Sequence, residues 1–321
     1  MAGRVFKGLF AVFICVVSVL QAGCEPAPLP LRIGSNLWPG YEPLYAAREL
    51  GYLNTERIKL VELPSASDVM DSIRLGNLEG GALTLDETLS LIAEGEDMVV
   101  ILVFDISAGA DMLLVRDNIH TLPELAGRNI AVETTAVGAL MVKSALDMAG
   151  LNATQVNIIH MPLTDHLAAF RAHRIDAAVT FEPFATELKN AGAHVLFDST
   201  AIQGQIVDVL AVKRSAINER LSDLRHLLRA YYQVHEAIRT APDSVMPVLN
   251  MRLKTVADEV PHLLDGLQLP DAELNRELLS GSPAPLERTA QQLATVMLRQ
   301  KLLPKSLLVN DMTQVIEPEA P

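Results

Sequence analysis

Residues 31–63 read LRIGSNLWPGYEPLYAARELGYLNTERIKLVEL, and their pattern points directly to a fold class. The short runs Leu31–Asn36 and Ile58–Leu63, in which β-branched and other apolar residues recur, predict two strands. Between them, the segment Glu42–Leu50 has the spacing of an amphipathic helix. This order of strand, helix and strand is typical of an α/β protein with a mainly parallel sheet.

The same alternation continues to about residue 213. Further strands are predicted at Gly81–Thr84, Met98–Phe104, Met112–Val115, Asn129–Glu133, Val156–His160, Ala177–Thr180, His194–Phe197 and Ile206–Val212. Helices are predicted at Ser67–Leu75, Asp86–Glu94, Val137–Ala149, Asp165–Arg171 and Pro183–Ala191. A helical tail follows, with one apolar face over Leu221–Ile238, another over Leu286–Leu302, and a loosely packed acidic end at Pro304–Pro321.

Two segments rich in small and polar residues bracket the middle of the chain. They are Phe104–Asp111 and Phe197–Gly204, and each joins two predicted strands. Two crossings of this kind would let one lobe be inserted in another and rotate against it, as in a hinged clamshell. The alternative is that both segments are ordinary loops within one large α/β domain.

The first residues have the layout of an export signal. Arg4 and Lys7 precede an apolar segment from Gly8 to Leu20, which is short for a membrane span. The following Leu20–Cys24 looks like a bacterial lipobox, so residues 1–23 are predicted to be a lipoprotein signal peptide and Cys24 to carry the lipid, with palmitate among its acyl chains. An ordinary cleaved signal and an uncleaved anchor are the alternatives. Residues 24–30, rich in proline, would tether the lipid to the globular part.

Charge and cysteine content narrow the environment and the partners. Removal of residues 1–23 takes away Arg4 and Lys7 and no acid, so the net charge goes from −13 to −15. Such an acidic body argues against nucleic acid and against docking on anionic lipid. Because Cys15 lies in the leader, the mature chain has no internal disulfide and depends on its apolar core. We expect a protein of the cell envelope that contacts the bilayer through the lipid on Cys24.

Ligands of open α/β sheets bind beyond the carboxyl ends of the strands. In the first lobe the ligand-binding candidates are Trp38, Tyr41, Ser65, Thr84 and Asp86. Trp38 is the chain's only tryptophan, and its flat ring is suited to stacking on a planar ligand; packing in the core is the alternative. Ser65 and Asp86 precede or begin helices, where capping is their ordinary role.

The crossing and the inserted lobe add further candidates. Asp105 and Ser107, with Asp111, could form the cleft floor or only turns. Thr134 follows a strand beside the carboxylate Glu133, and Glu182 ends another strand. A carboxylate buried near a cleft needs a partner, which could be a ligand N–H donor, a cation or helix amides.

These strand-end loops contain no Lys or Arg. A site for nitrate, sulfonate or phosphate would normally supply such a cation. We therefore expect a neutral or cationic, nitrogen-bearing and planar ligand.

Signatures of enzymes and metal sites are weak. The chain has no Gly-x-Ser-x-Gly motif, no phosphate-binding glycine loop and no cysteine pair for a metal. His160, His166 and His173 do not have the spacing of common zinc ligands. We expect no catalytic residue, no metal and no cofactor.

Several motifs resemble one family. They are Trp38–Leu44, Leu83–Glu87, Asp105–Asp111, Ala131–Glu133 and Thr180–Pro183. Over about Leu31–Lys213 the chain resembles the ABC-transporter solute-binding proteins for nitrate, sulfonate, taurine and thiamine precursors.

The resemblance implies a two-lobed type II periplasmic-binding fold. Residues 31–106 and 205–321 would form lobe I, with a helical tail from about residue 215, and residues 107–204 would form the inserted lobe II. The ligand would lie between the lobes, and an ABC permease or a membrane sensor would recognise the closed form.

Two other classes share this resemblance. Some thiamine-pyrimidine synthases and menaquinone-pathway enzymes are similar in fold, but a cytoplasmic enzyme would not need the leader before Cys24. The cysteine-rich motif of the former enzymes is also absent. The other class is a sensory lipoprotein that signals to a membrane receptor, and neighbouring permease or sensor genes would discriminate the two.

Overall fold

The computed structural model describes residues 29–133, 136–253 and 264–320. The predicted signal peptide, Cys24 and most of the predicted tether lie outside the described residues. Residues 31–321 form one compact unit. Among the described residues, no helix is both long and apolar enough to cross a bilayer.

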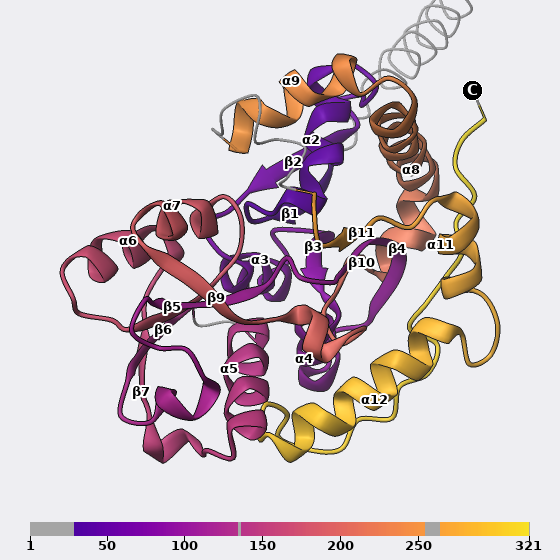
Figure 1. The fold of residues 1–321 in the computed structure, drawn as a ribbon. Helices are drawn as coiled ribbons and strands as arrows, with labels where there is room; N and C mark the ends of the chain where they lie inside the picture. The colour runs from indigo at the N-terminus through magenta and orange to yellow at the C-terminus, as the bar shows by residue number, and fades with distance from the viewer. Residues whose placement is uncertain (1–28, 134–135, 254–263, 321) are drawn as a thin grey trace, which may run out of the picture. The chain divides into compact units, whose positions relative to one another are not determined.

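Two mixed sheets carry the fold, which confirms the predicted α/β class with two lobes (Figure 1). The first sheet has the order β11-β4-β10-β3-β1-β2. Its strands are β1 (Leu31–Ser35), β2 (Ile58–Glu62), β3 (Gly80–Thr84), β4 (Met98–Ser107), β10 (Val207–Lys213) and β11 (Leu267–Gln268). The helices α2 (Glu42–Glu49), α3 (Ala66–Arg74) and α4 (Leu85–Glu94) follow β1, β2 and β3 along the chain.

The second sheet has the order β7-β6-β8-β5-β9. Its strands are β5 (Met112–Arg116), β6 (Asn129–Val132), β7 (Asn157–His160), β8 (Ala177–Thr180) and β9 (Ala193–Asp198). Helices α5 (Ala136–Ala149), α6 (Leu163–Arg171) and α7 (Phe184–Asn190) follow β6, β7 and β8. The chain enters this sheet between β4 and β5 and leaves it between β9 and β10.

Both sheets contain antiparallel pairs, which the sequence pattern did not predict. Strand β10 runs antiparallel to β3 and β4, and β5 runs antiparallel to β8 and β9. The pairing with β10 also extends β4 through Ser107, because Asp105 and Ile106 have partners in Asp208 and Val207. The prediction that the first crossing begins at Phe104 was therefore wrong, and Asp105 lies inside a strand.

The tail packs against the first sheet. It contains α8 (Arg214–Thr240), α9 (Pro242–Leu253), α11 (Ala272–Leu279) and α12 (Pro285–Arg299). Figure 1 shows α8 beside α2, and these two helices are in contact. Leu224, Leu228 and Tyr231 of α8 are buried as the apolar face predicts, whereas Leu221 is exposed beside the non-helical Arg220.

The prediction of a loosely packed end at Pro304–Pro321 was wrong. Val309, Met312 and Ile316 are buried. The N–H of Val100 in β4 donates to the carbonyl of Met312 at 2.8 Å, and the N–H of Gln314 donates to the carbonyl of Val100 at 3.0 Å. This segment therefore pairs with the first sheet. The pattern of residues within the segment does not predict this contact.

Candidate functional site

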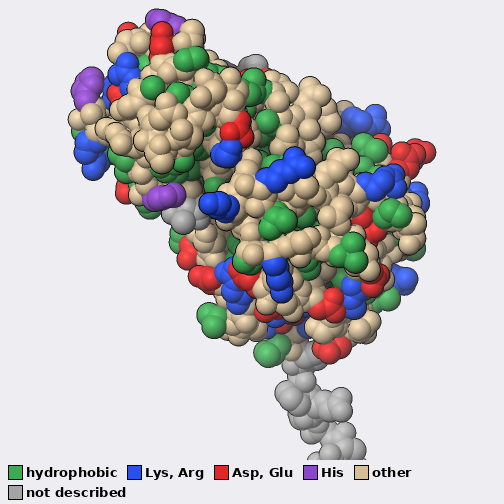
Figure 2. All heavy atoms as spheres, turned by 90° about the horizontal axis from the view of Figure 1, so that it is seen from below, with side chains coloured by type: hydrophobic (Ala, Val, Ile, Leu, Met, Phe, Trp, Pro, Cys, Tyr) green, Lys and Arg blue, Asp and Glu red, His purple; other side chains and the backbone are tan. Residues whose placement is uncertain are grey.

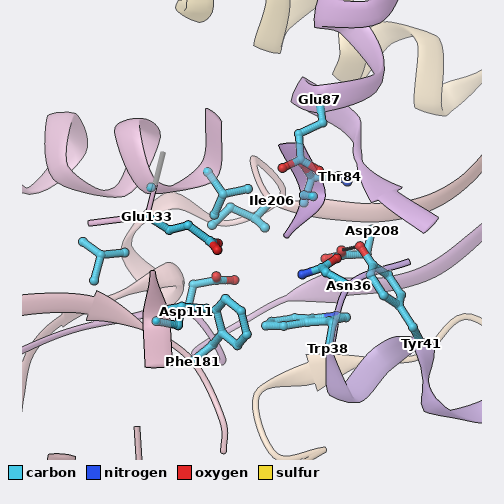
Figure 3. A pocket seen from close by; sticks show the side chains of 15 residues that line it. Asn36, Trp38, Tyr41, Thr84, Glu87, Asp111, Glu133, Phe181, Ile206 and Asp208 are labelled. Atoms are coloured by element: carbon cyan, nitrogen blue, oxygen red, sulfur yellow. Dashed lines mark hydrogen bonds between the residues drawn. The ribbon is translucent and has the colours of Figure 1, made fainter. Parts of the chain in front are cut away.

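A cavity of about 50 Å³ lies where strand ends of the two sheets meet (Figure 3). The first sheet contributes the segments after β1 and β3 and the start of β10, and the second contributes the segments after β6 and β8. The lining residues are Asn36, Trp38, Tyr41, Ala66, Thr84, Glu87, Asp111, Glu133, Val137, Gly138, Leu163, Val179, Phe181, Ile206 and Asp208. This is the position at which open α/β sheets bind ligands.

A row of polar side chains crosses the sheet beside the cavity. Asp208 of β10 is paired in register with Thr84 of β3 on one side and with Asp105 of β4 on the other. Residues that are directly opposite in antiparallel strands project from the same face, so these three side chains lie next to one another. The row places two carboxyl groups together in a buried position.

Two aromatic donors come from the turn after β1. The indole Nε1–H of Trp38 donates to Asp105 Oδ2 at 3.0 Å, and the hydroxyl of Tyr41 donates to Asp208 Oδ1. Both rings are buried, and the short η1 helix (Pro39–Tyr41) sets their spacing. The Trp-Pro-Gly-Tyr turn therefore holds the two carboxyl groups through one hydrogen bond each.

Burial dominates the ionisation of this pair. It raises the pKa of Asp105 to about 7, against the opposing hydrogen bond from Trp38. Burial, followed by the neighbouring Asp105, raises the pKa of Asp208 well above its usual range. Asp105 Oδ1 and Asp208 Oδ2 receive no hydrogen bond from any other group, although the two carboxyl groups lie close enough to hydrogen-bond to each other when one of them holds a proton. Such a pair is most stable when it holds a proton or faces a cation.

Three more carboxyl groups surround the cavity. Figure 3 shows the carboxylates of Glu133 and Asp111 pointing into the same space from the side of the second sheet, and Glu87 from above. Burial raises the pKa of Glu87 to about 8 and that of Asp111 and of Glu133 to about 7. Asp111 is 3% exposed and its Oδ2 has no hydrogen-bond partner. The cavity can thus accept hydrogen bonds from several directions.

The two sheets touch through an aromatic pair at this cavity. The rings of Trp38 and Phe181 lie edge to face, with centroids 4.9 Å apart and planes at 82°. Trp38 follows β1 of the first sheet and Phe181 follows β8 of the second. A ligand between the sheets would contact both rings.

The structure separates the nine predicted ligand-binding residues into groups. Trp38, Tyr41 and Thr84 line the cavity, while Asp86 and Asp105 are buried without lining it. Thr134 lies outside the described residues. The other three are placed elsewhere and have partners of their own.

These three make contacts within the protein. Ser65 accepts a hydrogen bond from the backbone N–H of Asp68 at 3.2 Å and so caps α3. The Ser107 hydroxyl lies 2.7 Å from the Ser199 hydroxyl. Glu182 pairs with Lys189 at 3.1 Å and accepts from the N–H of Thr186 at 2.9 Å, which is the structural alternative for this carboxylate. It lines a second hollow together with Trp38 and Gly109.

Of the lining residues that were not among the sequence candidates, four have polar or aromatic side chains. They are Asn36, Glu87, Phe181 and Asp208. The sequence could have indicated Asp208, because it is the single charged residue in the apolar run Ile206–Val212. A charge in the middle of a predicted strand needs a partner or a function. In the described residues, no group of three or more His, Cys, Asp or Glu is arranged to hold a metal ion.

Two mixed α/β sheets with a cavity at their facing strand ends define the architecture of a two-lobed binding protein. The comparison with family models matches residues 25–245, and the chain belongs to the NMT1-like family.

The relatives are similar in part of their length. A protein of Escherichia coli (strain K12) whose name describes aliphatic sulfonate binding is 26% identical over 191 residues, 57% of this chain and 59% of its own. A protein of Brachyspira hyodysenteriae named as an ABC transporter periplasmic binding protein is 24% identical over 204 residues. That alignment covers 58% of each chain, so this chain spans less than two thirds of either relative.

The fold is shared over a greater length. The crystal structure of the periplasmic aliphatic sulphonate binding protein SsuA from Escherichia coli superposes with a TM-score of 0.73 and 20% identity. The match covers 92% of this chain and 95% of that one. It supports the two-lobed fold, including the tail beyond the region of motif resemblance.

Proposed function

We propose that this protein is an extracytoplasmic solute-binding protein that captures a small nitrogen-bearing ligand between two lobes and delivers it to an ABC importer. Lobe I comprises residues 31–106 and 205–321, and lobe II residues 107–204. The observation that carries the proposal is the cavity that strand ends of both sheets line, with Trp38 and Phe181 in contact beside it. Family membership and the names of the relatives support the same role.

Location follows from the leader. Cys24 carries the lipid, residues 1–23 are removed, and residues 24–30 form the tether, so the protein faces the periplasm or the exterior on a membrane. The test is metabolic labelling with palmitate followed by fractionation. The label should be lost in Cys24→Ala, and a labelled Cys24→Ala protein would contradict the anchor.

Ligand chemistry follows from the donors and acceptors that the cavity offers. Its described lining has four carboxyl groups, one amide and no Lys, Arg or His. A planar ligand with N–H donors would bind the carboxylates and contact the rings of Trp38 and Phe181. Because one relative is named for sulfonate binding, sulfonates should be tested beside the nitrogen-bearing compounds.

A thermal-shift screen tests capture. Pyrimidines, amines, sulfonates and nitrate would be added to the purified chain, and we expect nitrogen-bearing compounds to raise the melting temperature. A compound that binds should lose affinity in Trp38→Ala. Tyr52→Ala, which removes an exposed ring outside the cavity, serves as the control and should leave the affinity unchanged. Equal affinity in Trp38→Ala and wild type would contradict this site.

Ligand closure would shift the population of the two lobes towards the form that a permease recognises. Uptake by vesicles that contain the permease and ATPase of the same operon tests the transport role. Ligand-dependent transport that needs this protein is the expected result. Binding without transport would favour a sensory role.

A further inference from the structure

We infer that the captured ligand is an organic cation, with a charged N–H head in the cavity and an apolar body in an adjoining groove. The inference rests on the proposed capture function and names the class of solute. It depends on three features of the described residues: the charge of the cavity, its size and the two lining residues that it shares with the groove.

The charge of the cavity is of one sign. Glu87, Asp111, Glu133 and Asp208 line it, and no described lining residue is basic. Asp111 Oδ2 and Asp208 Oδ2 belong to side chains that are 3% and 2% exposed, and neither atom accepts a hydrogen bond from an N–H group or a hydroxyl; only a proton shared with Asp105 would serve Asp208 in the absence of a ligand. Buried carboxylate oxygens without a donor are satisfied by a ligand that brings donors and positive charge. An anionic head would add a like charge to the same space.

The cavity is small. A volume of about 50 Å³ holds only a few water-sized groups, since about 10–15 Å³ admits one water. An ammonium or amidinium group fits this space, whereas the rest of an organic ligand needs more room.

That room adjoins the cavity. A groove of about 680 Å³ shares Glu87 and Glu133 with it. Apolar side chains from four elements and from the segment after α12 form its wall, namely Met70, Val132, Val142, Leu146, Ile158 and Leu302. The two shared carboxylates mark the point at which a bound molecule would pass from polar to apolar surroundings.

The Arg and Lys side chains at the groove have partners within the protein. Arg74 pairs with Glu94 at 2.6 Å, and Lys143 pairs with Asp147 on its own helix. Figure 2 shows basic and acidic side chains interspersed on the face seen from below rather than gathered in one basic patch. The groove therefore supplies apolar contact for an alkyl or aryl body.

Isothermal titration of the purified full chain with four probes tests the inference. The probes are n-hexylammonium, 1-hexanesulfonate, hexanamide and methylammonium at a slightly alkaline pH. We expect hexylammonium to bind at least about tenfold more tightly than hexanesulfonate and hexanamide, because one satisfied charge pair in a buried site has that effect. Methylammonium should bind about tenfold or more weakly than hexylammonium, because it buries no chain.

Two variants with matched controls locate the halves of the ligand. Glu133→Gln should weaken hexylammonium about tenfold, while Asp117→Asn, an exposed acid outside the cavity, should not. Ile158→Ser should weaken hexylammonium more than methylammonium. Val195→Ser, at a similarly exposed strand position outside the groove, should leave both unchanged.

The outcomes separate the inference from the proposed function. Tighter binding of hexanesulfonate or hexanamide than of hexylammonium overturns the cationic class but leaves capture in place. Equal binding of methylammonium and hexylammonium overturns the apolar body. If no probe binds, the inference is overturned, and the wider thermal-shift screen decides whether capture itself stands.

Discussion

The indole of Trp38 meets the ring of Phe181 edge to face at 4.9 Å, and this pair joins the two sheets at the edge of the cavity. Aromatic pairs of this geometry contribute about 0.5–1.5 kcal/mol beyond the area that they bury. Phe181 lies at the end of β8 and is only half-buried, so the pair depends on the approach of the two sheets.

Phe181→Ala should therefore weaken ligand affinity by about two- to tenfold while the protein remains folded. Phe181→Leu keeps apolar volume and should lose less. The measurements are titration with a ligand found in the screen and small-angle scattering of the ligand-free protein. An unchanged affinity in Phe181→Ala would show that the contact does not contribute to closure.

Gly40 is required because the Trp-Pro-Gly-Tyr turn closely approaches the carboxyl group of Asp105. A Cβ at this position would meet the Asp105 carboxylate and lie 2.7 Å from Trp38 Nε1. Gly40→Ala should force Trp38 and Asp105 apart and lower the free energy of unfolding by about 1–3 kcal/mol, the usual effect of overpacking. Urea unfolding measures the change.

The cause can be checked with a double-mutant cycle. In an Asp105→Ala background the added methyl group no longer meets a carboxylate, so Gly40→Ala should be less destabilising there than in the wild type. Strict additivity of the two substitutions would place the strain elsewhere.

The sequence predicted those elements correctly whose structure depends mainly on residues near one another in the chain. The prediction of β1 from Leu31–Asn36 differs from the observed Leu31–Ser35 by one residue, and β8 was predicted at its observed bounds. In β1 the apolar Leu31 and Ile33 alternate with other residues, and β8 is a short, mostly apolar run; both patterns are typical of strands. The alternation of strands and helices also gave the α/β class.

The row of polar side chains beside the cavity depends on pairing between segments that are distant in the sequence. Asp208 reaches Asp105 and Thr84 only through the antiparallel register of β10 with β4 and β3. No window of sequence contains that register, so the carboxyl pair could not be predicted, although the isolated charge of Asp208 was visible. The contact of Met312 and Gln314 with Val100 is non-local in the same way.

Arg252 of α9 connects the helical tail to α2 and β2. Its guanidinium contacts Glu42 at 2.8 Å and Glu62 at 3.2 Å, and its Cζ lies 3.3 Å from the centroid of the Tyr45 ring. Glu42 is 1% exposed, and burial raises its pKa to about 7 even though Arg252 opposes the shift. The ion pair is therefore buried at one end.

Arg252→Leu should lower the free energy of unfolding by about 3 kcal/mol near pH ~8, because it leaves the Glu42 carboxylate buried without a counter-ion. The loss should be smaller near pH ~6, where Glu42 can hold a proton. Arg239→Leu removes an exposed pair with Glu236 on α8 and should have no measurable effect. Equal losses at the two pH values would argue against the role of Glu42.

The carboxyl groups in and beside the cavity predict an unusual pH dependence of the ligand-free protein. Burial raises the pKa of Glu87 to about 8 and that of Asp105, Asp111 and Glu133 to about 7, whereas carboxyl groups of the unfolded chain titrate near about 4. Between these values the folded state holds more protons than the unfolded state, so stability falls as pH rises.

Two histidines oppose this trend at lower pH. Burial lowers the pKa of His166 to about 4 and also lowers that of His235, so stability is lost as pH falls through the range in which unfolded histidine gains a proton, near about 6.5. The melting temperature should therefore rise from about pH 8 to about pH 6.5 and level off below it. Calorimetry in buffers of low ionisation enthalpy measures the profile.

The variant Glu87→Gln tests whether a cavity carboxyl group causes the change of melting temperature with pH. Glu87 accepts a hydrogen bond from the Thr84 N–H at 2.9 Å, which the amide oxygen of glutamine can also accept, so the helix cap survives while one titrating carboxyl is removed. The slope of melting temperature against pH above neutrality should decrease. Glu287→Gln makes the matched change at the cap of α12, where Glu287 accepts from the Ala284 N–H at 3.0 Å, and should retain the wild-type slope.

Proton release on binding is the corresponding prediction for the occupied cavity. A cation among Glu87, Asp111, Glu133 and Asp208 would favour their charged forms, so its binding should release protons and tighten as pH rises from about 6.5 to about 8. Titration of hexylammonium in two buffers of different ionisation enthalpy measures the number of protons released. Tighter binding at the lower pH would exclude a cation from this cavity, because a cation cannot bind more strongly as the carboxylates around it are neutralised.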